Sequence, residues 1–166
     1  MNALAIFDLV RILLILILAY LAYIDIRTFR LPDAITIPLI ILGICFNNFP
    51  RVQFTALSDS IIGAFVGYVM LWLFNRLYRY FKTQDGIGMG DAKLLAALGA
   101  WLGWGALPGI LFFASVAGLI GGIAWLKLKK QNPGSAFPFG PFLVIAGIIE
   151  LLWPQLLQNL FLISQT

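Results

Sequence analysis

Long apolar runs, separated by short connections rich in glycine, proline and charge, dominate the chain. A helix that crosses a bilayer needs about 20 mostly apolar residues, and six segments approach that length. They cover residues 3–24, 34–48, 60–80, 93–106, 109–126 and 139–157. The pattern predicts an all-α polytopic membrane protein, a bundle of about six transmembrane helices that forms a single domain over residues 1–166.

The fourth and fifth segments are divisions of one run, residues 94–126, which carries no charge. Its 33 residues are too many for one span. Because Gly105 and Pro108 interrupt it, we expect the helix to break between residues 106 and 109.

Composition supports a membrane protein. Hydrophobic residues make up 61% of the chain and charged residues 11%, whereas soluble domains are about 45–50% apolar and about 25% charged. A soluble protein of this size needs more polar residues to cover its surface. The composition therefore excludes a soluble enzyme, a disordered chain and a disulfide scaffold.

The basic residues are distributed unevenly between the two sides of the predicted bundle. Nine of the 11 border the connections that follow the first, third and fifth segments, and Arg11 and Arg51 fall on the other side. Lys and Arg concentrate on the cytoplasmic side of membrane proteins, so we expect both termini to lie outside the cytoplasm. Since the charges are scattered singly, they indicate membrane orientation, with the lipid bilayer as partner and no nucleic acid. The nine are Arg27, Arg30, Arg76, Arg79, Lys82, Lys93, Lys127, Lys129 and Lys130.

Small residues recur at four-residue spacing in three segments: the pair Gly63 and Gly67, the pair Gly99 and Gly103, and the row Ala114, Gly118 and Gly122. Such faces let helix backbones approach closely inside a membrane. We interpret all three as helix-packing surfaces.

Two aspartates stand out among the seven acidic residues. Asp25 ends the first segment and Asp91 begins the fourth, so the topology places both at the same depth on the cytoplasmic side. Two close carboxylates hold a single proton between them; one can activate water while the other protonates a carbonyl oxygen. This aspartic protease chemistry needs no metal or cofactor, and it is compatible with a chain that has no histidine.

Three glycines at alternate positions, Gly86, Gly88 and Gly90, precede Asp91. Glycine permits close backbone approach and unusual dihedral angles, as a mobile catalytic loop requires. The plainer interpretation is that Asp91 only caps the fourth helix after a flexible loop. Taken alone, the Gly-x-Gly-Asp pattern does not separate the two.

Three stretches in order along the chain resemble motifs of the type IV prepilin peptidases. The resemblance covers roughly residues 20–147, and the order and spacing of the stretches make it specific. They are Asp25-Ile26-Arg27-Thr28-Phe29-Arg30-Leu31-Pro32-Asp33-Ala34-Ile35-Thr36, Gly88-Met89-Gly90-Asp91-Ala92-Lys93-Leu94-Leu95, and Phe137-Pro138-Phe139-Gly140-Pro141-Phe142.

The resemblance implies an integral-membrane aspartic endopeptidase of the Gly-x-Gly-Asp type. Such enzymes cut the short basic leader from type IV prepilins or pilin-like secretion pseudopilins at the cytoplasmic face of the bacterial inner membrane. Asp25 and Asp91 match the two catalytic aspartates, and Gly86, Gly88 and Gly90 form the supporting loop. Neither a metal nor a cofactor is implied.

Many members of the family also carry a cytoplasmic domain with paired Cys-x-x-Cys motifs and methylate the new N-terminus. This sequence begins almost at the first peptidase helix, and its only cysteine is Cys45. We therefore expect a short form that lacks methyltransferase activity.

Asp33, Lys93 and Glu150 are secondary candidates. Asp33 follows Leu31-Pro32, where capping of the second helix is the expected role. Lys93 lies two residues after Asp91, and because a cation lowers a neighbouring carboxyl pKa, we expect it to point away from the pair. Glu150 lies about ten residues into the sixth segment, where a carboxyl group is either functional by default or close to the outer interface.

Two other functions stay open at this point. An intramembrane protease of the presenilin type shares the Gly-x-Gly-Asp element, although the Leu-Pro-Asp stretch argues against it. A small transporter or a pilus-assembly scaffold is the alternative from another class, in which Asp25, Asp91 and Glu150 form a proton or cation path.

The charge asymmetry makes the topology testable. Reporter fusions at Pro50 and at the C-terminus should lie outside the cytoplasm, and fusions at Thr83 and Gln131 should lie inside, because nine Lys and Arg residues border the inner connections. Paired alkaline phosphatase and fluorescent-protein fusions distinguish the two sides. A C-terminal fusion on the cytoplasmic side would contradict the six-helix topology.

Overall fold

The computed structural model describes residues 3–82, 88–129 and 138–154, and these form six α-helices and one short 3₁₀ helix. Gly86 of the predicted supporting loop lies outside the described residues. The elements are α1 (Ala3–Thr28), α2 (Asp33–Asn47), α3 (Leu57–Lys82), α4 (Met89–Leu102), η1 (Trp104–Ala106), α5 (Leu107–Lys129) and α6 (Gly140–Leu152). The structure confirms an all-α bundle.

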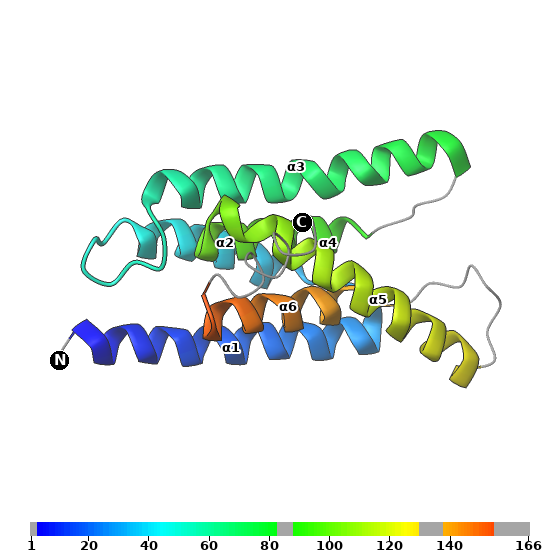
Figure 1. Cartoon of the computed structure of the whole chain (residues 1–166), viewed down its shortest axis with the longest axis horizontal. Coiled ribbons are helices and arrows are strands. Elements are labelled where there is room, and N and C mark those ends of the chain that lie inside the picture. Colours follow the sequence, from blue (N-terminus) through cyan, green and yellow to red (C-terminus); the bar gives the residue numbers. More distant parts are fainter. Residues whose placement is uncertain (1–2, 83–87, 130–137, 155–166) are drawn as a thin grey trace, which may run out of the picture.

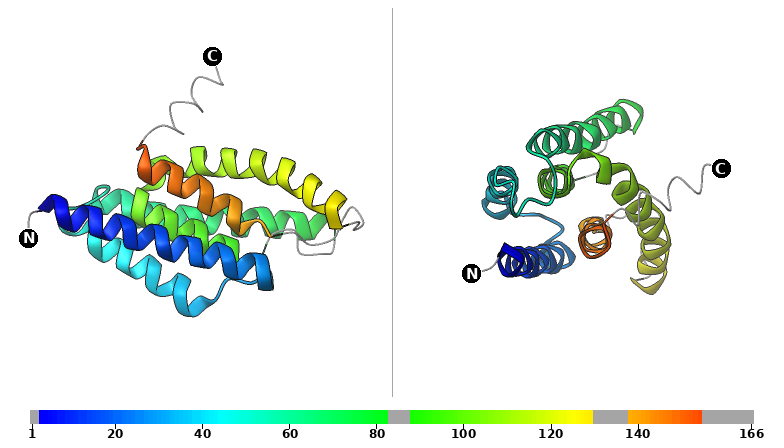
Figure 2. Two further views of the ribbon diagram at one scale, coloured as in Figure 1. Left: turned by 90° about the horizontal axis from the view of Figure 1, so that it is seen from below. Right: turned by 60° about the vertical axis from the view of Figure 1, so that its left-hand side comes forward.

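The helices run in alternating directions with α4 at the centre (Figures 1 and 2). Helix α4 contacts α2, α3, α5 and α6, and α6 also packs against α1 and α5. Every residue of α4 from Leu94 to Trp101 is buried, as expected for a helix that is apolar all round. The last turns of α1, α3 and α5 and the first turns of α2, α4 and α6 lie at one end of the bundle (Figure 1). We call it the aspartate end.

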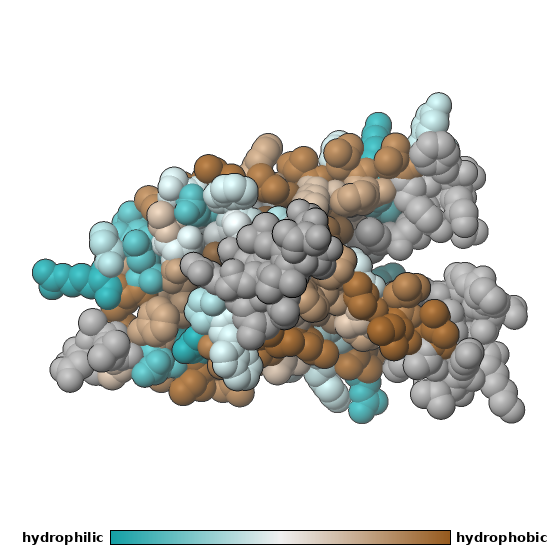
Figure 3. Space-filling model, in the orientation of Figure 1, coloured by the Kyte–Doolittle hydropathy of each residue, from teal (hydrophilic) through white to brown (hydrophobic). Residues whose placement is uncertain are grey.

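Three stretches are long and apolar enough to cross a membrane, at Ala5–Thr28, Leu57–Leu77 and Trp104–Ile123. Helices α2 and α6 are apolar but shorter. Large apolar side chains stand exposed on these helices, among them Leu16, Phe65 and Leu119, and such surfaces are typical of contact with lipid. Figure 3 shows apolar residues over much of one face, with hydrophilic residues gathered where α2 connects to α3.

Glycines let α3 and α4 touch along their backbones. A Cβ on Gly63 would lie 2.4 Å from the Gly99 carbonyl oxygen, and a Cβ on Gly67 would lie 2.7 Å from the Leu95 carbonyl oxygen. Neither contact leaves room for a side chain. Both glycines of the first predicted pair therefore form a packing surface, as expected.

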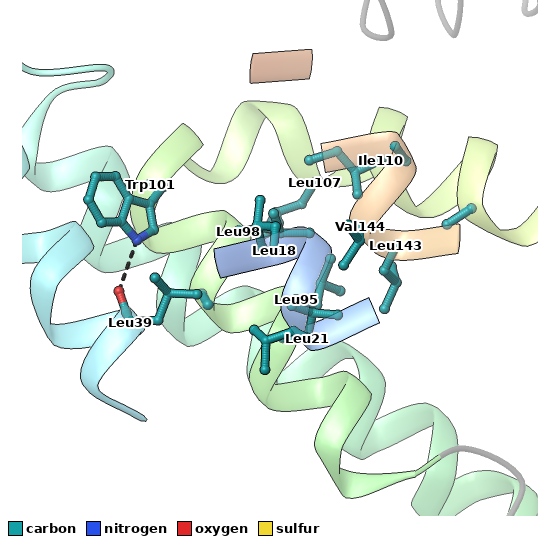
Figure 4. Packing of buried hydrophobic residues seen from close by; sticks show 14 of the residues in the cluster. Leu18, Leu21, Leu39, Leu95, Leu98, Trp101, Leu107, Ile110, Leu143 and Val144 are labelled. Atoms are coloured by element: carbon teal, nitrogen blue, oxygen red, sulfur yellow. Dashed lines mark hydrogen bonds between the residues drawn. The ribbon is translucent and has the colours of Figure 1, made fainter. Parts of the chain in front are cut away.

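Leucines from several helices fill the centre of the bundle (Figure 4). Leu18 and Leu21 of α1 meet Leu95 and Leu98 of α4, and residues of α5 and α6 complete the cluster. At its edge the Trp101 indole N–H donates to the Leu39 carbonyl oxygen of α2 at 2.9 Å. The indole fits there because the α2 residue opposite it, Gly43, has no side chain.

The break between the fourth and fifth helices is where the prediction was wrong. Helix α4 ends at Leu102 because Gly103 adopts φ +85°, which favours glycine. Pro108 lies in the first turn of α5 instead of ending a helix, since a first turn tolerates proline. The break therefore falls several residues before the predicted position.

A buried asparagine, Asn47, ties α4 to its neighbours at the end opposite the aspartate end. Its amide donates to the carbonyl oxygens of Ala100 and Trp101 at 2.9 and 3.1 Å, and its oxygen accepts the N–H of Phe54 at 2.9 Å. The Ser60 hydroxyl donates to the same Ala100 oxygen at 2.5 Å. The last carbonyls of a helix lack partners within it, so these bonds satisfy the end of α4.

Asn47→Ala should destabilise the protein by about 2–4 kcal/mol, because it leaves several buried backbone groups unpaired. The neighbouring Asn48→Ala is the matched control, since Asn48 is exposed and surface changes usually fall within about 0.5 kcal/mol. Denaturant unfolding in detergent micelles measures both. Equal midpoints would show that Asn47 does not hold α4.

Candidate active site

The last turn of α1 places Asp25 at the aspartate end. Its backbone carbonyl accepts the N–H of Phe29 at 2.8 Å, and Phe29 has φ +54°. A left-handed residue after a helix ends it and turns the chain. The turn brings Leu31, which is buried, back against the start of α4.

The first turn of α4 carries Asp91. The helix begins at Met89 with Gly88 as N-cap, so Asp91 is not the N-cap but its third residue. Its carboxylate accepts the backbone N–H of Gly88, as an acidic residue at the third position often does. Gly90 lies against Leu31, where a Cβ would approach the Leu31 Cβ to 2.9 Å. The close contact fixes the start of α4 against the connection between α1 and α2.

The first residue of α6 lies between the two carboxylates. The backbone N–H of Gly140 donates to Asp25 Oδ2 at 3.1 Å in a buried hydrogen bond. A Cβ on Gly140 would lie 2.7 Å from Asp25 Oδ2 and 3.4 Å from Asp91 Oδ1. The structure therefore brings Asp25 of α1 and Asp91 of α4 close together, and the first residue of α6 packs against both carboxylates.

Burial makes the pair electrostatically unusual. Asp25 is 5% exposed and Asp91 is 8% exposed. Asp91 lies outside the three long apolar stretches, and burial, helped by the nearby Asp25 carboxylate, raises the pKa of Asp91 to about 7, although the Gly88 N–H opposes the shift. Near neutral pH, the Asp91 carboxyl therefore retains a proton for much of the time.

Such a pair has the parts for acid–base hydrolysis. A protonated carboxyl group beside an ionised one can donate to a carbonyl oxygen while the other activates a water molecule. The two groups come from different helices, Asp25 from the last turn of α1 and Asp91 from the first turn of α4.

Asp33 and Lys93 form an ion pair, with Lys93 Nζ 2.5 Å from Asp33 Oδ1. The pair links the first turn of α2 to the first turn of α4. The expected capping role of Asp33 is wrong: Pro32 is the N-cap of α2, with no side-chain cap bond. Asp33 is the first residue of α2 and turns its carboxylate to Lys93, because that cation lies within reach.

Glu150 lies in the last turns of α6, away from the aspartate end. It is buried and lines a cavity of about 360 Å³ together with Arg11, Asp59 and Trp104. Ten residues of helix separate it from Gly140, or roughly 15 Å. The structure therefore does not bring Glu150 to the two aspartates.

Gly140 is the site residue that sequence reasoning missed as a functional group. Its signal was the Phe139-Gly140-Pro141 element before the last helix, which indicated a motif but no contact. Only the packing of α6 against α1 shows that the Gly140 N–H donates to Asp25 Oδ2.

The type IV leader peptidase family matches residues 12–123 of the chain. A prepilin leader peptidase/N-methyltransferase of Aeromonas hydrophila is 42% identical over 151 residues, which cover 91% of this chain and 51% of that protein.

Other relatives carry the same name. Those of Pectobacterium carotovorum subsp. carotovorum and Pseudomonas aeruginosa are 40% and 42% identical over 141 and 132 residues, covering 85% and 80% of this chain and 50% and 45% of each relative. The chain thus spans about half the length of the curated relatives it matches. No solved structure matches it.

The raised pKa of Asp91 can be measured directly. In the protein labelled with ¹³C at aspartate, the Asp91 carboxyl signal should titrate near pH 7, well above the ordinary value of 3.8. Asp25→Asn should lower that midpoint, because it removes the neighbouring negative charge. A midpoint near 3.8 in the unmodified protein would contradict the buried pair.

Proposed function

The chain belongs to the type IV leader peptidase family, and on that premise we propose that it is an aspartic endopeptidase that removes the basic leader of prepilins or pilin-like pseudopilins. The observation that carries the proposal is the meeting of Asp25 and Asp91 at one buried point beside Gly140. Its relatives carry the name prepilin leader peptidase/N-methyltransferase.

The proposed reaction uses the two carboxyl groups in different protonation states. Asp91, whose pKa of about 7 lets it hold a proton near neutral pH, donates to the oxygen of the scissile carbonyl. Asp25 accepts a proton from the attacking water as that water adds to the carbonyl carbon. Collapse of the tetrahedral intermediate breaks the C–N bond and releases the leader and the new amine: the amine takes the proton from Asp25, and the hydroxyl that Asp91 had protonated returns its proton to Asp91.

The position of the pair suits a substrate that lies partly in the bilayer. The aspartate end is where nine of the 11 Lys and Arg residues lie in the predicted topology, so we place the active site at the cytoplasmic face of the bacterial inner membrane. A hollow of about 510 Å³ lies between α3 and the start of α4, lined by Trp72, Leu77 and Met89 among others. It offers apolar surface two residues from Asp91 to the membrane helix of a prepilin.

The transporter or scaffold alternative receives less support from the geometry. It requires Asp25, Asp91 and Glu150 to form one path, whereas Glu150 lies near the far end of α6, roughly 15 Å away along the helix. Several buried apolar residues of α4 and α6, including Leu98 and Leu143, lie in the core between the two ends.

Asp25→Asn and Asp91→Asn should each reduce prepilin cleavage by at least about 1,000-fold, since amides keep the side-chain volume but cannot exchange the proton that the reaction needs. The assay is leader removal from a co-expressed prepilin, followed by gel shift and mass spectrometry. Membrane levels of each variant should equal those of the unmodified protein.

Asp33→Asn and Glu150→Gln are the matched controls. Both should retain most activity, because one loses only an exposed ion pair, worth little in stability, and the other lies away from the pair. If Asp91→Asn still cuts at a normal rate, the aspartic mechanism is wrong. If Glu150→Gln abolishes function while the two Asp→Asn variants do not, the transporter alternative is supported instead of the peptidase.

A further inference from the structure

The start of α6 contacts the catalytic pair directly. Gly140 donates its backbone N–H to Asp25 Oδ2 at 3.1 Å, and Asp25 is 5% exposed. The first N–H groups of a helix lack partners within it and point outward. The N–H of Gly140 is therefore free to hold a carboxylate oxygen that other helices present to it.

The same residue has no room for a side chain. A Cβ would lie 2.7 Å from Asp25 Oδ2 and 3.1 Å from Asp25 Cγ, and 3.4 Å from Asp91 Oδ1. Contacts under about 3 Å force a shift, and the group that must shift here is the Asp25 carboxylate. Any larger residue at this position would thus displace the Asp25 carboxylate from its position beside Asp91.

The residues beside Gly140 hold it in place. Phe139 lies against Gly118 of α5, where a Cβ would come within 3.0 Å of its ring, and Phe142 lies against Gly121, where a Cβ would come within 2.4 Å. Because α5 offers glycines at both points, the two rings sit directly on its backbone. The first turn of α6 is therefore wedged between α5 and the aspartates.

The far end of α6 is also anchored to α1. The Arg11 guanidinium donates to the carbonyl oxygens of Leu151 and Leu152, with Nε 2.9 Å from the Leu151 oxygen. Two contacts between the same pair of helices, one at each end, fix how far α6 can slide along α1. The Gly140 N–H is thus presented to Asp25 in a set position, as a preorganised site requires.

We propose that Gly140 is a positioning residue of the catalytic pair: its N–H orients the Asp25 carboxylate, and its missing side chain keeps the space between Asp25 and Asp91 open. The proposal rests on the proposed peptidase function. It adds a third helix, α6, to the two that carry the aspartates.

The first test compares two alanine substitutions on one helix. Gly140→Ala should lower kcat for prepilin cleavage about 100-fold with little change in KM, since a misplacement of about 1 Å at a reacting group has that effect. Gly147→Ala is the matched control on the same helix, because the atoms nearest to its Cβ belong to the apolar Leu98 side chain, with Cδ2 at 2.5 Å, and not to either aspartate. It should keep a normal kcat, and equal kcat values for the two variants would overturn the proposal.

The second test needs neither cleavage nor a substitution at Gly140. In ¹⁵N NMR spectra of the protein in micelles, the Gly140 amide proton should resonate downfield and move upfield in Asp25→Asn, where the acceptor loses its charge. Asp33→Asn, the control, should leave the signal in place. An identical signal in all three proteins would overturn the proposal.

The two tests distinguish a failure of the positioning role from a failure of the peptidase function. A protein that cuts no prepilin but shows the Asp25-dependent shift of the Gly140 amide refutes the peptidase function and leaves the contact established. If the Gly140→Ala variant cuts prepilin normally, the positioning role is wrong and the peptidase function stands.

Discussion

The burial of two neighbouring carboxyl groups beside Gly140 is the constraint on which the other features of this protein depend. Asp25 and Asp91 are almost inaccessible, and like charges at close range in a medium of low dielectric repel strongly. The pair is tolerated because the raised pKa of Asp91 lets that carboxyl group hold a proton near neutral pH, and because backbone N–H groups face each carboxylate. Gly140 supplies one N–H and Gly88 the other, so the supporting donors come from the backbone of helix starts and carry no net charge.

Close helix approach makes this arrangement possible. Gly63 and Gly67 let α3 touch the backbone of α4, Gly90 lets the start of α4 touch Leu31, and Gly140 admits both carboxylates. Apolar side chains alone do not drive helices together in lipid, and close contact between small residues supplies attraction instead. The same property of glycine, the absence of a side chain, therefore allows both the close helix packing and the contact of Gly140 with the two carboxylates.

Polar contacts at the opposite end of the bundle complete the support. Asn47 and Ser60 satisfy the last carbonyls of α4, and Arg11 does the same for α6. The helices that carry Asp91 and Gly140 are thereby held at the end farthest from them. A site formed from three helix ends needs such anchors, because a small rotation or slide of any helix would separate the groups.

The sequence by itself determined the class of the molecule and the identity of the two aspartates as a candidate pair. Apolar runs depend only on local composition, so they predicted an all-α membrane bundle, and the motifs around Asp25 and Asp91 carried the family. Only the tertiary structure decided the rest: the helix break at Gly103, the pairing of Asp33 with Lys93, and the amide of Gly140 on a carboxylate 115 residues away. These features depend on which helix faces meet, and that choice is made by the packing of small side chains across the whole bundle.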